Sequence, residues 1–214
     1  MFGAILMTGN RENSTGKSLG VLISGRGTNL QSILDAIAHG TLAASVAVVI
    51  SNRPGAAGLA RADAAGIATL VLDHRAHATR EAYDAELAAA LAARDVDLVC
   101  LAGFMRVLTP AFVSTFPNRI VNIHPSLLPA FPGVDAQRQA WAHGVKVAGA
   151  TVHLVDDSLD GGPIVMQEAI EVDPGDTAET LAARILEVEH RLYPRAIAEV
   201  LAGGWRLDGR RVVR

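Results

Sequence analysis

The first half of the chain alternates short apolar runs with alanine- and leucine-rich segments of helical periodicity. The apolar runs predict strands at residues 19–24, 46–51, 69–72, 98–102 and 120–123, and the periodic segments predict helices at residues 29–38, 57–65 and 80–93. Strands that alternate with helices along a chain indicate a parallel sheet covered by helices. We therefore predict an α/β fold with a doubly wound, mostly parallel sheet.

The second half follows a different pattern. A short helix is predicted at residues 137–143, followed by longer strands at 147–155 and 164–172 that could pair in antiparallel fashion. Thr177 has the character of an N-cap for a long helix that continues past Pro194 to residue 201. The Asp208-Gly209 dipeptide near the end stands at a hairpin position. This half adds an antiparallel extension to the parallel sheet.

The amino-acid composition limits the kinds of molecule that the protein could bind. The 214 residues are 50% apolar, enough for one packed core, and the formal net charge of −3 argues against nucleic-acid binding and a polybasic membrane surface. The mean hydropathy is +0.28, yet the apolar runs are far shorter than the ~18 residues of a membrane span. Cys100 is the single cysteine, so an internal disulfide is impossible and a cytoplasmic location is expected.

The same sequence patterns predict the domain organisation. Residues 1–17 contain a brief apolar patch without the features of a signal peptide, and we expect them to form a disordered extension. A single domain is predicted over residues 18–203, followed by a hairpin tail at 204–214. Alanine-rich helix surfaces could supply the interface of a homodimer.

Two polar side chains with catalytic chemistry end the fifth predicted strand. Asn122 and His124 are two residues apart, and residues i and i+2 of a strand share a face. An imidazole titrates near neutral pH, and a carboxamide can donate a hydrogen bond to a developing oxyanion. The pair favours acyl-group transfer. The alternative is that both side chains only satisfy backbone groups beside a proline-rich loop.

A carboxylate for this pair is available in a glycine-rich stretch farther along. Asp160 precedes Gly161 and Gly162 between two apolar runs. A carboxylate within roughly 4–6 Å of an imidazole favours the protonated ring and fixes its orientation. Amide, imidazole and carboxylate would form one constellation. His153, on a predicted strand, is more typical of a packed or hydrogen-bonded histidine than of a catalytic one.

A glycine-containing turn, Ser24-Gly-Arg-Gly-Thr-Asn29, joins the first predicted strand to the first helix. Exposed amides and the positive end of the helix dipole favour an anion such as phosphate there. The dinucleotide fingerprint fails, because Leu30 stands at the position of its third glycine. From the residues alone, a phosphate site and an ordinary tight turn remain equally open.

These motifs together resemble the folate-dependent formyltransferases, in particular the branch that acts on glycinamide ribonucleotide in purine synthesis. The resemblance runs from about Leu19 to the end of the chain. Its motifs are Ile-Ser-Gly-Arg-Gly-Thr-Asn-Leu at 23–30, Leu-Ala-Gly-Phe-Met-Arg at 101–106, Asn-Ile-His-Pro-Ser-Leu-Leu-Pro at 122–129 and Leu-Asp-Gly-Gly-Pro at 159–163. The resemblance implies the formyltransferase fold, with a phosphate-binding half at 18–100 and a folate-binding and catalytic half at 101–203.

The resemblance also implies roles for individual residues. Asn122, His124 and Asp160 would be catalytic. The ribonucleotide and its phosphate would be bound by Gly27, Thr28, Asn29 and Glu189, although Glu189 taken alone is more typical of surface charge. The folate pocket would be lined by Arg80, Met105, Arg106, Val107, Leu108, Asn122, Val155, Asp156, Asp157, Ser158 and Leu159. By spacing alone, residues 105–108 are more typical of core packing.

The implied reaction is direct formyl transfer from 10-formyltetrahydrofolate, the co-substrate, to the amine of glycinamide ribonucleotide. The amine attacks the formyl carbon, Asn122 and cationic His124 stabilise the tetrahedral oxyanion, Asp160 keeps His124 protonated, and a water relays the amine proton to N10. The products are the N2-formyl ribonucleotide and tetrahydrofolate. No metal is expected, because the histidines lack ligand spacing.

Other functions remain open. A formyltetrahydrofolate hydrolase would use a similar Asn, His and Asp on water, but usually carries a further regulatory domain, and a methionyl-tRNA formyltransferase would need a further basic domain. A nucleotide-binding oxidoreductase or a non-catalytic sugar-phosphate-binding α/β protein would use the 25–29 turn and leave Asn122, His124 and Asp160 without a role. Asp135 stands where many formyltransferases carry histidine, and we expect it to alter the pH dependence modestly.

Overall fold

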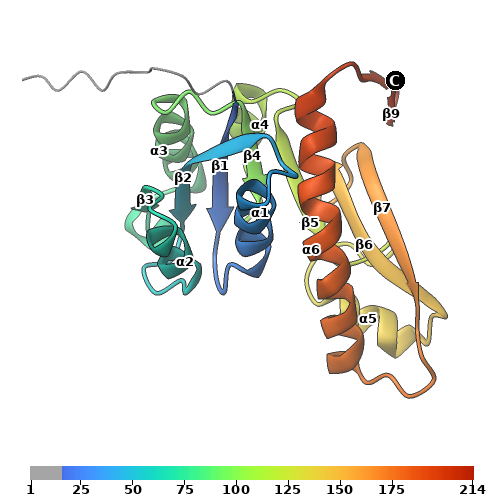
Figure 1. Cartoon of the computed structure of the whole chain (residues 1–214). Coiled ribbons are helices and arrows are strands. Elements are labelled where there is room, and N and C mark those ends of the chain that lie inside the picture. Colours follow the sequence, from blue (N-terminus) through green and yellow to red (C-terminus); the bar gives the residue numbers. More distant parts are fainter. Residues whose placement is uncertain (1–15) are drawn as a thin grey trace, which may run out of the picture.

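The computed structural model describes residues 16–214, whose nine strands form one sheet in the order β3-β2-β1-β4-β5-β6-β7-β9-β8 (Figure 1). The strands are β1 (Lys17–Ile23), β2 (Ala44–Ser51), β3 (Thr69–Val71), β4 (Leu98–Leu101), β5 (Ile120–His124), β6 (Val147–Leu154), β7 (Ile164–Glu171), β8 (Arg206–Asp208) and β9 (Arg211–Val213). The helices are α1 (Thr28–Ala38), α2 (Gly58–Ala64), α3 (Arg80–Ala92), α4 (Pro110–Thr115), α5 (Ala136–His143) and α6 (Ala178–Ala202), with a 3₁₀ turn, η1, at His74–Ala76. The expected extension at 1–17 lies outside the described residues, apart from Gly16 and Lys17.

The sheet is parallel from β3 to β5 and then changes direction. β1 pairs in parallel with β2 and β4, and β4 pairs in parallel with β5. β6 runs antiparallel to both β5 and β7. The prediction of a mostly parallel sheet with an antiparallel extension is confirmed.

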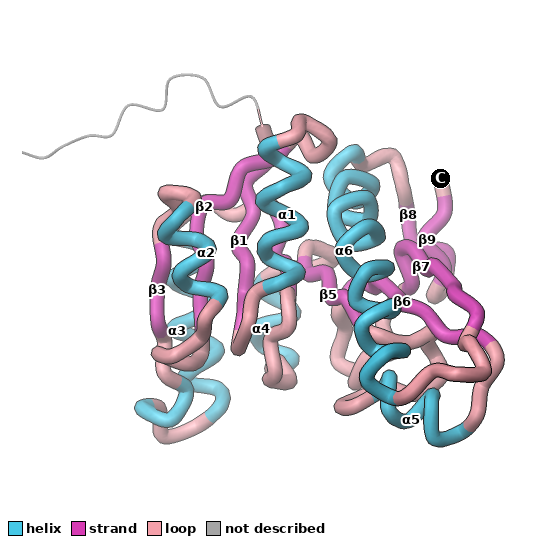
Figure 2. The backbone as a smooth tube through the Cα atoms, turned by 60° about the horizontal axis from the view of Figure 1, so that its bottom comes forward, coloured by secondary structure: helices cyan, strands magenta, loops and turns pink. Residues whose placement is uncertain are grey.

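Helices cover both faces of the parallel half, and two separate cores result. Alternate side chains of β1 point to opposite faces, so that Val21 packs with α1 and α6 residues while Leu22 packs with α3 and α4 residues. Figure 2 shows α1, α2 and α6 together in front of the sheet, with α3 and α4 behind it. Strands buried on both faces have mostly apolar sequences. The apolar runs between the helical segments therefore located these strands correctly.

The helix α4 was not predicted. It has only six residues, too few for a periodic apolar pattern, but its start carries a local signal: Thr109 accepts a hydrogen bond from the Phe112 amide, and Pro110 occupies the first turn. Asp84 on α3 is buried, although charged residues of a helix at the protein surface usually face solvent. Its carboxylate accepts from the Thr109 amide at 2.6 Å and so fixes the start of α4.

The long helix α6 ties the two halves of the sheet together. Thr177 caps it in a reciprocal capping box with Thr180. The buried Tyr193 hydroxyl lies 3.0 Å from the carbonyl oxygen of Leu101 on β4 and 3.1 Å from that of Val121 on β5. None of the helices in the described part of the chain combines the length and hydropathy needed to cross a membrane.

Candidate active site

The candidate site lies where the carboxyl ends of β1, β4 and β5 meet. The chain order reverses between β1 and β4, since β1 continues to β2 on one side and β4 continues to β5 on the other. Open parallel sheets bind ligands at such a switch point, beyond the carboxyl ends of the strands. The loop after β1, the loop after β4 and the end of β5 therefore share one edge.

Asn122, His124 and Asp160 come together at this edge. Asp160 Oδ2 lies 3.4 Å from His124 Nδ1, and Asp160 Oδ1 lies 3.5 Å from Asn122 Nδ2. Asn122 and His124 share one face of β5, while Asp160 arrives from the loop after β6, which pairs with β5. A carboxylate faces both polar heads of the strand, as the sequence predicted.

Asp160 is held by the loop before α5 and by the close packing of its own loop. The Gly133 amide donates to Asp160 Oδ2 at 2.7 Å, and Asp160 itself adopts a positive φ of 50°. Gly162 packs so closely on β6 that an added Cβ would lie 1.8 Å from the Leu154 carbonyl oxygen. Only glycine fits there, so the close packing sets where Asp160 points.

The His124 ring is fixed on both sides. Its Nε2–H donates to the Phe131 carbonyl oxygen at 2.9 Å, because a carbonyl can only accept. Nδ1 then faces Asp160 Oδ2 at 3.4 Å, an ion-pair distance for a protonated ring. The side chain is almost fully buried. Both N–H groups of a charged His124 are therefore engaged by the protein itself.

His153 lies directly against Asn122, a contact that the sequence reasoning did not assign. Its Nδ1–H donates to the Leu154 carbonyl oxygen at 2.8 Å, which leaves Nε2 unprotonated in the neutral ring. Nε2 accepts from Asn122 Nδ2 at 3.2 Å. Burial lowers the pKa of His153, which keeps this tautomer neutral. The ring thereby orients the Asn122 amide with its nitrogen toward the site.

The phosphate loop, defined here as residues 25–29, follows β1 and opens α1. Gly27 adopts a left-handed φ of 69°, and a Cβ there would lie 2.6 Å from Gly58 Cα. No side chain among residues 16–214 caps α1 by a hydrogen bond, so the first amides of the helix remain available. Arg61 donates through Nε to the Arg26 carbonyl oxygen at 3.0 Å and braces the turn.

Glu189 is buried beside this loop, with 5% of its surface exposed. Its Oε2 accepts from Asn29 Nδ2 at 2.6 Å. Burial raises the pKa of Glu189 to about 7, against the lowering effects of the Asn29 hydrogen bond and the Arg26 charge. The interpretation of Glu189 as surface charge is therefore wrong, and the carboxyl group can both donate and accept near neutral pH.

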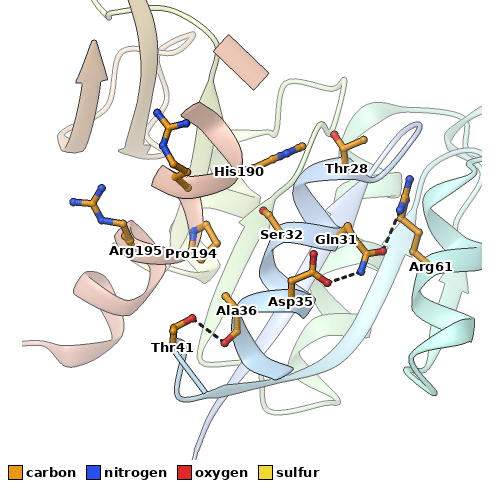
Figure 3. Close-up of a pocket in the computed structure, with 11 residues that line it drawn as sticks. Thr28, Gln31, Ser32, Asp35, Ala36, Thr41, Arg61, His190, Pro194 and Arg195 are labelled. Carbon is orange, nitrogen blue, oxygen red and sulfur yellow. Dashed lines mark hydrogen bonds between the residues drawn. The ribbon is translucent and has the colours of Figure 1, made fainter. Parts of the chain in front are cut away.

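A groove of about 620 Å³ begins at the phosphate loop and runs between α1 and α6 (Figure 3). Thr28 lines its end nearest the loop, and Arg61, Asp35 and His190 line its walls. Gln31 links two of these side chains, because it donates to Asp35 and accepts from Arg61. The groove extends away from the Asn122, His124 and Asp160 group and shares only Thr28 with the predicted ribonucleotide residues.

Apart from Arg80 on α3 and Asn122 on β5, the predicted folate residues occupy the loop after β4 and the loop after β6. Met105, Val107 and Leu159 expose 62%, 52% and 58% of their surfaces, which is unusual for apolar side chains beside a polar site. Leu108 is buried, and Val155 packs partly against the core of the α3 and α4 face.

The charged members of the predicted folate set have more varied surroundings. Arg106 lies over the Tyr83 ring at 4.9 Å, and the exposed Arg80 begins α3 three residues before Tyr83. Asp156 accepts from the Ser158 amide at 2.9 Å, and Asp157 and Ser158 are exposed. The loop after β6 thus presents polar groups around the exposed Leu159.

Asp135 stands at the N-cap position of α5 with a left-handed φ of 56°, two residues after Gly133. It makes no side-chain capping hydrogen bond within the described residues. Within residues 16–214, no group of three or more His, Cys, Asp or Glu side chains is arranged to hold a metal ion.

Comparisons with known proteins show the family of the chain. The formyl transferase family matches residues 17–197. The chain is 47% identical over 190 residues to phosphoribosylglycinamide formyltransferase from Escherichia coli (strain K12), covering 89% of this chain and 87% of that protein. It is 50% identical over 189 residues to the trifunctional purine biosynthetic protein adenosine-3 of Drosophila melanogaster, but spans only 14% of that protein's length. The crystal structure of glycinamide ribonucleotide transformylase 1 from Symbiobacterium toebii has a TM-score of 0.90 and 55% identity, and covers 94% of this chain and 97% of the other.

Proposed function

Because the chain belongs to the formyl transferase family, we propose that it transfers the formyl group of 10-formyltetrahydrofolate to the amine of glycinamide ribonucleotide in purine biosynthesis. The observation that carries the proposal is the convergence of Asn122, His124 and Asp160 at the carboxyl edge of the sheet. The loop after β1, which opens α1, the loop after β4 and the end of β5 lie next to one another at this edge in the order of the strands.

The formyl donor fits the apolar side of the site. Exposed Met105, Val107 and Leu159 offer the surface that a flat pteridine ring would cover, and the nearby 155–158 backbone offers polar groups for its edge. We assign the donor to the loop after β4 and the loop after β6, with Arg80 and Arg106 as the cations available for the donor's carboxylates. Bound folate carries N10 and its formyl group toward Asn122.

The ribonucleotide fits the loop after β1. The amides of Gly27, Thr28 and Asn29 at the start of α1 suit a phosphate dianion, and Arg26 adds positive charge. Glu189 hydrogen-bonds to Asn29 and has capacity left for a hydroxyl group of the ribose. This orientation sends the glycinamide amine toward the Asn122, His124 and Asp160 group.

The proposed chemistry needs no covalent enzyme intermediate. The neutral amine forms a bond to the formyl carbon, the bond from that carbon to N10 breaks, and the amine proton is relayed through water to N10. Asn122 supplies the hydrogen bond to the oxyanion, since its 3.5 Å contact with Asp160 is long and easily exchanged. His124 acts through its positive charge, because its Nε2–H is held by Phe131.

Several coarser properties follow from this proposal. We propose small-molecule substrates and a cytoplasmic enzyme, with residues 18–203 as one formyltransferase domain and residues 204–214 as a tail. The homodimer remains a prediction that light scattering tests. The buried Cys100 plays no part in the chemistry, and burial raises the pKa of its thiol.

The deciding experiment follows formyl transfer spectroscopically with 10-formyltetrahydrofolate, with and without glycinamide ribonucleotide, using wild type and His124→Ala. Folate release that requires the ribonucleotide and collapses in the variant supports the proposal. Release without the ribonucleotide would instead identify a formyltetrahydrofolate hydrolase. No release under either condition, with a phosphate ligand still bound, would identify a sugar-phosphate-binding protein.

A further inference from the structure

Ser24 connects the two loops that we assign to different substrates. Ser24 lies between the end of β1 and the phosphate loop. The loop after β4 is called here the donor loop (residues 103–108), and it contains Gly103 and Met105. The Ser24 amide donates to the Gly103 carbonyl oxygen at 3.1 Å. The Met105 amide in turn donates to Ser24 Oγ at 2.8 Å. Ser24 is therefore joined by two hydrogen bonds to the start of the donor loop, one at Gly103 and one at Met105.

The Ser24 hydroxyl is itself anchored in the core. It donates to Asn52 Oδ1 at 2.6 Å, so that Oγ both donates and accepts. Ser24 and Asn52 expose 3% and 1% of their surfaces, which shields these bonds from water. His74 Nδ1 lies 3.0 Å from the Asn52 carbonyl oxygen and 3.3 Å from Asn52 Nδ2, so His74 contacts both the backbone and the side chain of Asn52.

The remaining anchors of the donor loop lead to a different part of the fold. Arg106 packs on Tyr83, and the Thr109 amide just after the loop donates to Asp84. Both partners lie on α3. The contacts with α3 thus hold the far end of the donor loop, whereas Ser24 holds the near end and relates it to the phosphate loop.

We infer that Ser24 is a positioning residue for formyl transfer, which sets the donor loop relative to the phosphate loop. The inference rests on the proposed function, because it needs a donor on one loop and an acceptor on the other. Ser24 does not touch the reacting atoms. Its hydroxyl holds the Met105 peptide in the conformation that receives folate, and loss of the hydroxyl leaves that amide to be ordered by the donor itself.

The test compares Ser24→Ala with Ser51→Ala. Ser51 is an equally buried serine on the neighbouring strand, and its hydroxyl bonds only locally, to the backbone of Arg53. We expect Ser24→Ala to raise the KM for 10-formyltetrahydrofolate about tenfold, the range of one neutral hydrogen bond, with kcat within about twofold of wild type. Ser51→Ala should leave both constants within about twofold. Equal KM values in the two variants would overturn the inference.

A second variant approaches the same hydroxyl from its other partner. Asn52→Ala removes the acceptor that orients Ser24 Oγ, and we expect a similar rise in the KM of the donor. The double variant should match either single variant within about threefold, because both act through one hydrogen-bonded chain. If the increases in KM of the two single variants multiplied in the double variant, Ser24 and Asn52 would act independently, and the inference would be contradicted. Absence of turnover in the wild type would refute the proposed function instead; tetrahydrofolate binding to the same variants would then decide whether Ser24 positions the donor loop.

Discussion

Asn29 and Glu189, 160 residues apart in the chain, are joined by a buried hydrogen bond of 2.6 Å between Nδ2 and Oε2. The bond connects the first turn of α1 to the middle of α6. It brings a carboxyl group to the end of a helix that otherwise attracts anions. Burial makes the charged form of Glu189 costly and raises its pKa to about 7.

This raised pKa predicts a specific pH dependence of stability. The folded state binds the Glu189 proton more tightly than the unfolded state, whose pKa is near 4.5, so this stabilisation is complete below pH 4.5 and is lost as pH rises through about 7. The loss amounts to about 3 kcal/mol at 1.36 kcal/mol per pKa unit. Urea unfolding of wild type and Glu189→Gln at pH 5 and pH 8 measures it. Wild type should lose more stability than the variant over this range, and parallel losses would contradict the prediction.

Asp160→Asn should inactivate the protein without unfolding it. The variant removes the negative charge that faces the imidazole. Its amide oxygen can replace Oδ2 and still accept from the Gly133 amide, but its amide nitrogen then replaces Oδ1 and meets Asn122 Nδ2, which is also a donor. We expect kcat to fall about 10²–10³-fold, in the range seen when an electrostatic group is removed from an active site. Single-turnover formyl transfer measures this fall. Asp208→Asn, in the exposed tail hairpin, is the matched control and should keep wild-type turnover.

His153 should act on catalysis through Asn122. His153→Ala removes the acceptor that orients the Asn122 amide, and a rotated amide would present its oxygen to a developing oxyanion. We expect kcat to fall about 10–100-fold with little change in either KM, because the lost contact matters most in the transition state. His143→Ala, at an exposed histidine of α5, should leave kcat unchanged. A His153→Ala variant with normal kcat would show that Asn122 holds its orientation unaided.

Much of the fold could be predicted from the sequence because local patterns and burial agree in its parallel half. The carboxyl-terminal parts of β1 and β2 and the whole of β4 are buried on both faces, and their residues are therefore mostly apolar. The Asn122 and His124 pair could be placed on one face because strand periodicity is exactly two residues. Asp160 could be predicted as their partner because it is a carboxylate in a glycine-rich loop between two apolar runs, and the resemblance then implied a catalytic role for all three residues.

The misinterpreted residues were those whose partners lie far away in the chain. Glu189 follows Val188 on the apolar stripe of α6, and only contact with Asn29 explains its burial. Asp84 is a second case of a distant partner: its buried carboxylate accepts from the amide of Thr109, the N-cap of α4, and that helix is too short to show a periodic pattern. Helical periodicity predicts which face of a helix is buried, but it does not predict a hydrogen bond that buries one polar side chain.

The close packing of Gly162 predicts that the Asp160 loop tolerates no side chain there. In Gly162→Ala the new Cβ would meet the Leu154 carbonyl oxygen and carbon, both backbone atoms that cannot rotate away. We expect a loss of about 1–3 kcal/mol in unfolding free energy from overpacking, and a fall in kcat as Asp160 moves. Gly55→Ala is the control, because a Cβ at Gly55 meets nothing within 4 Å. Denaturant unfolding and kcat measurements should both give lower values for Gly162→Ala than for Gly55→Ala.

The two buried tyrosines predict opposite responses to loss of a hydroxyl. Tyr193 Oη lies within hydrogen-bonding distance of the Leu101 and Val121 carbonyl oxygens, so Tyr193→Phe leaves buried acceptors without a donor and should cost about 1–2 kcal/mol. Tyr83 Oη is equally buried but has no hydrogen-bond partner among the described residues. Tyr83→Phe therefore removes a desolvated hydroxyl that contributes no bond, and stability should stay equal or rise. Urea unfolding at neutral pH compares the pair directly. A larger loss in Tyr83→Phe than in Tyr193→Phe would mean that the Tyr193 hydroxyl does not link α6 to β4 and β5 in solution.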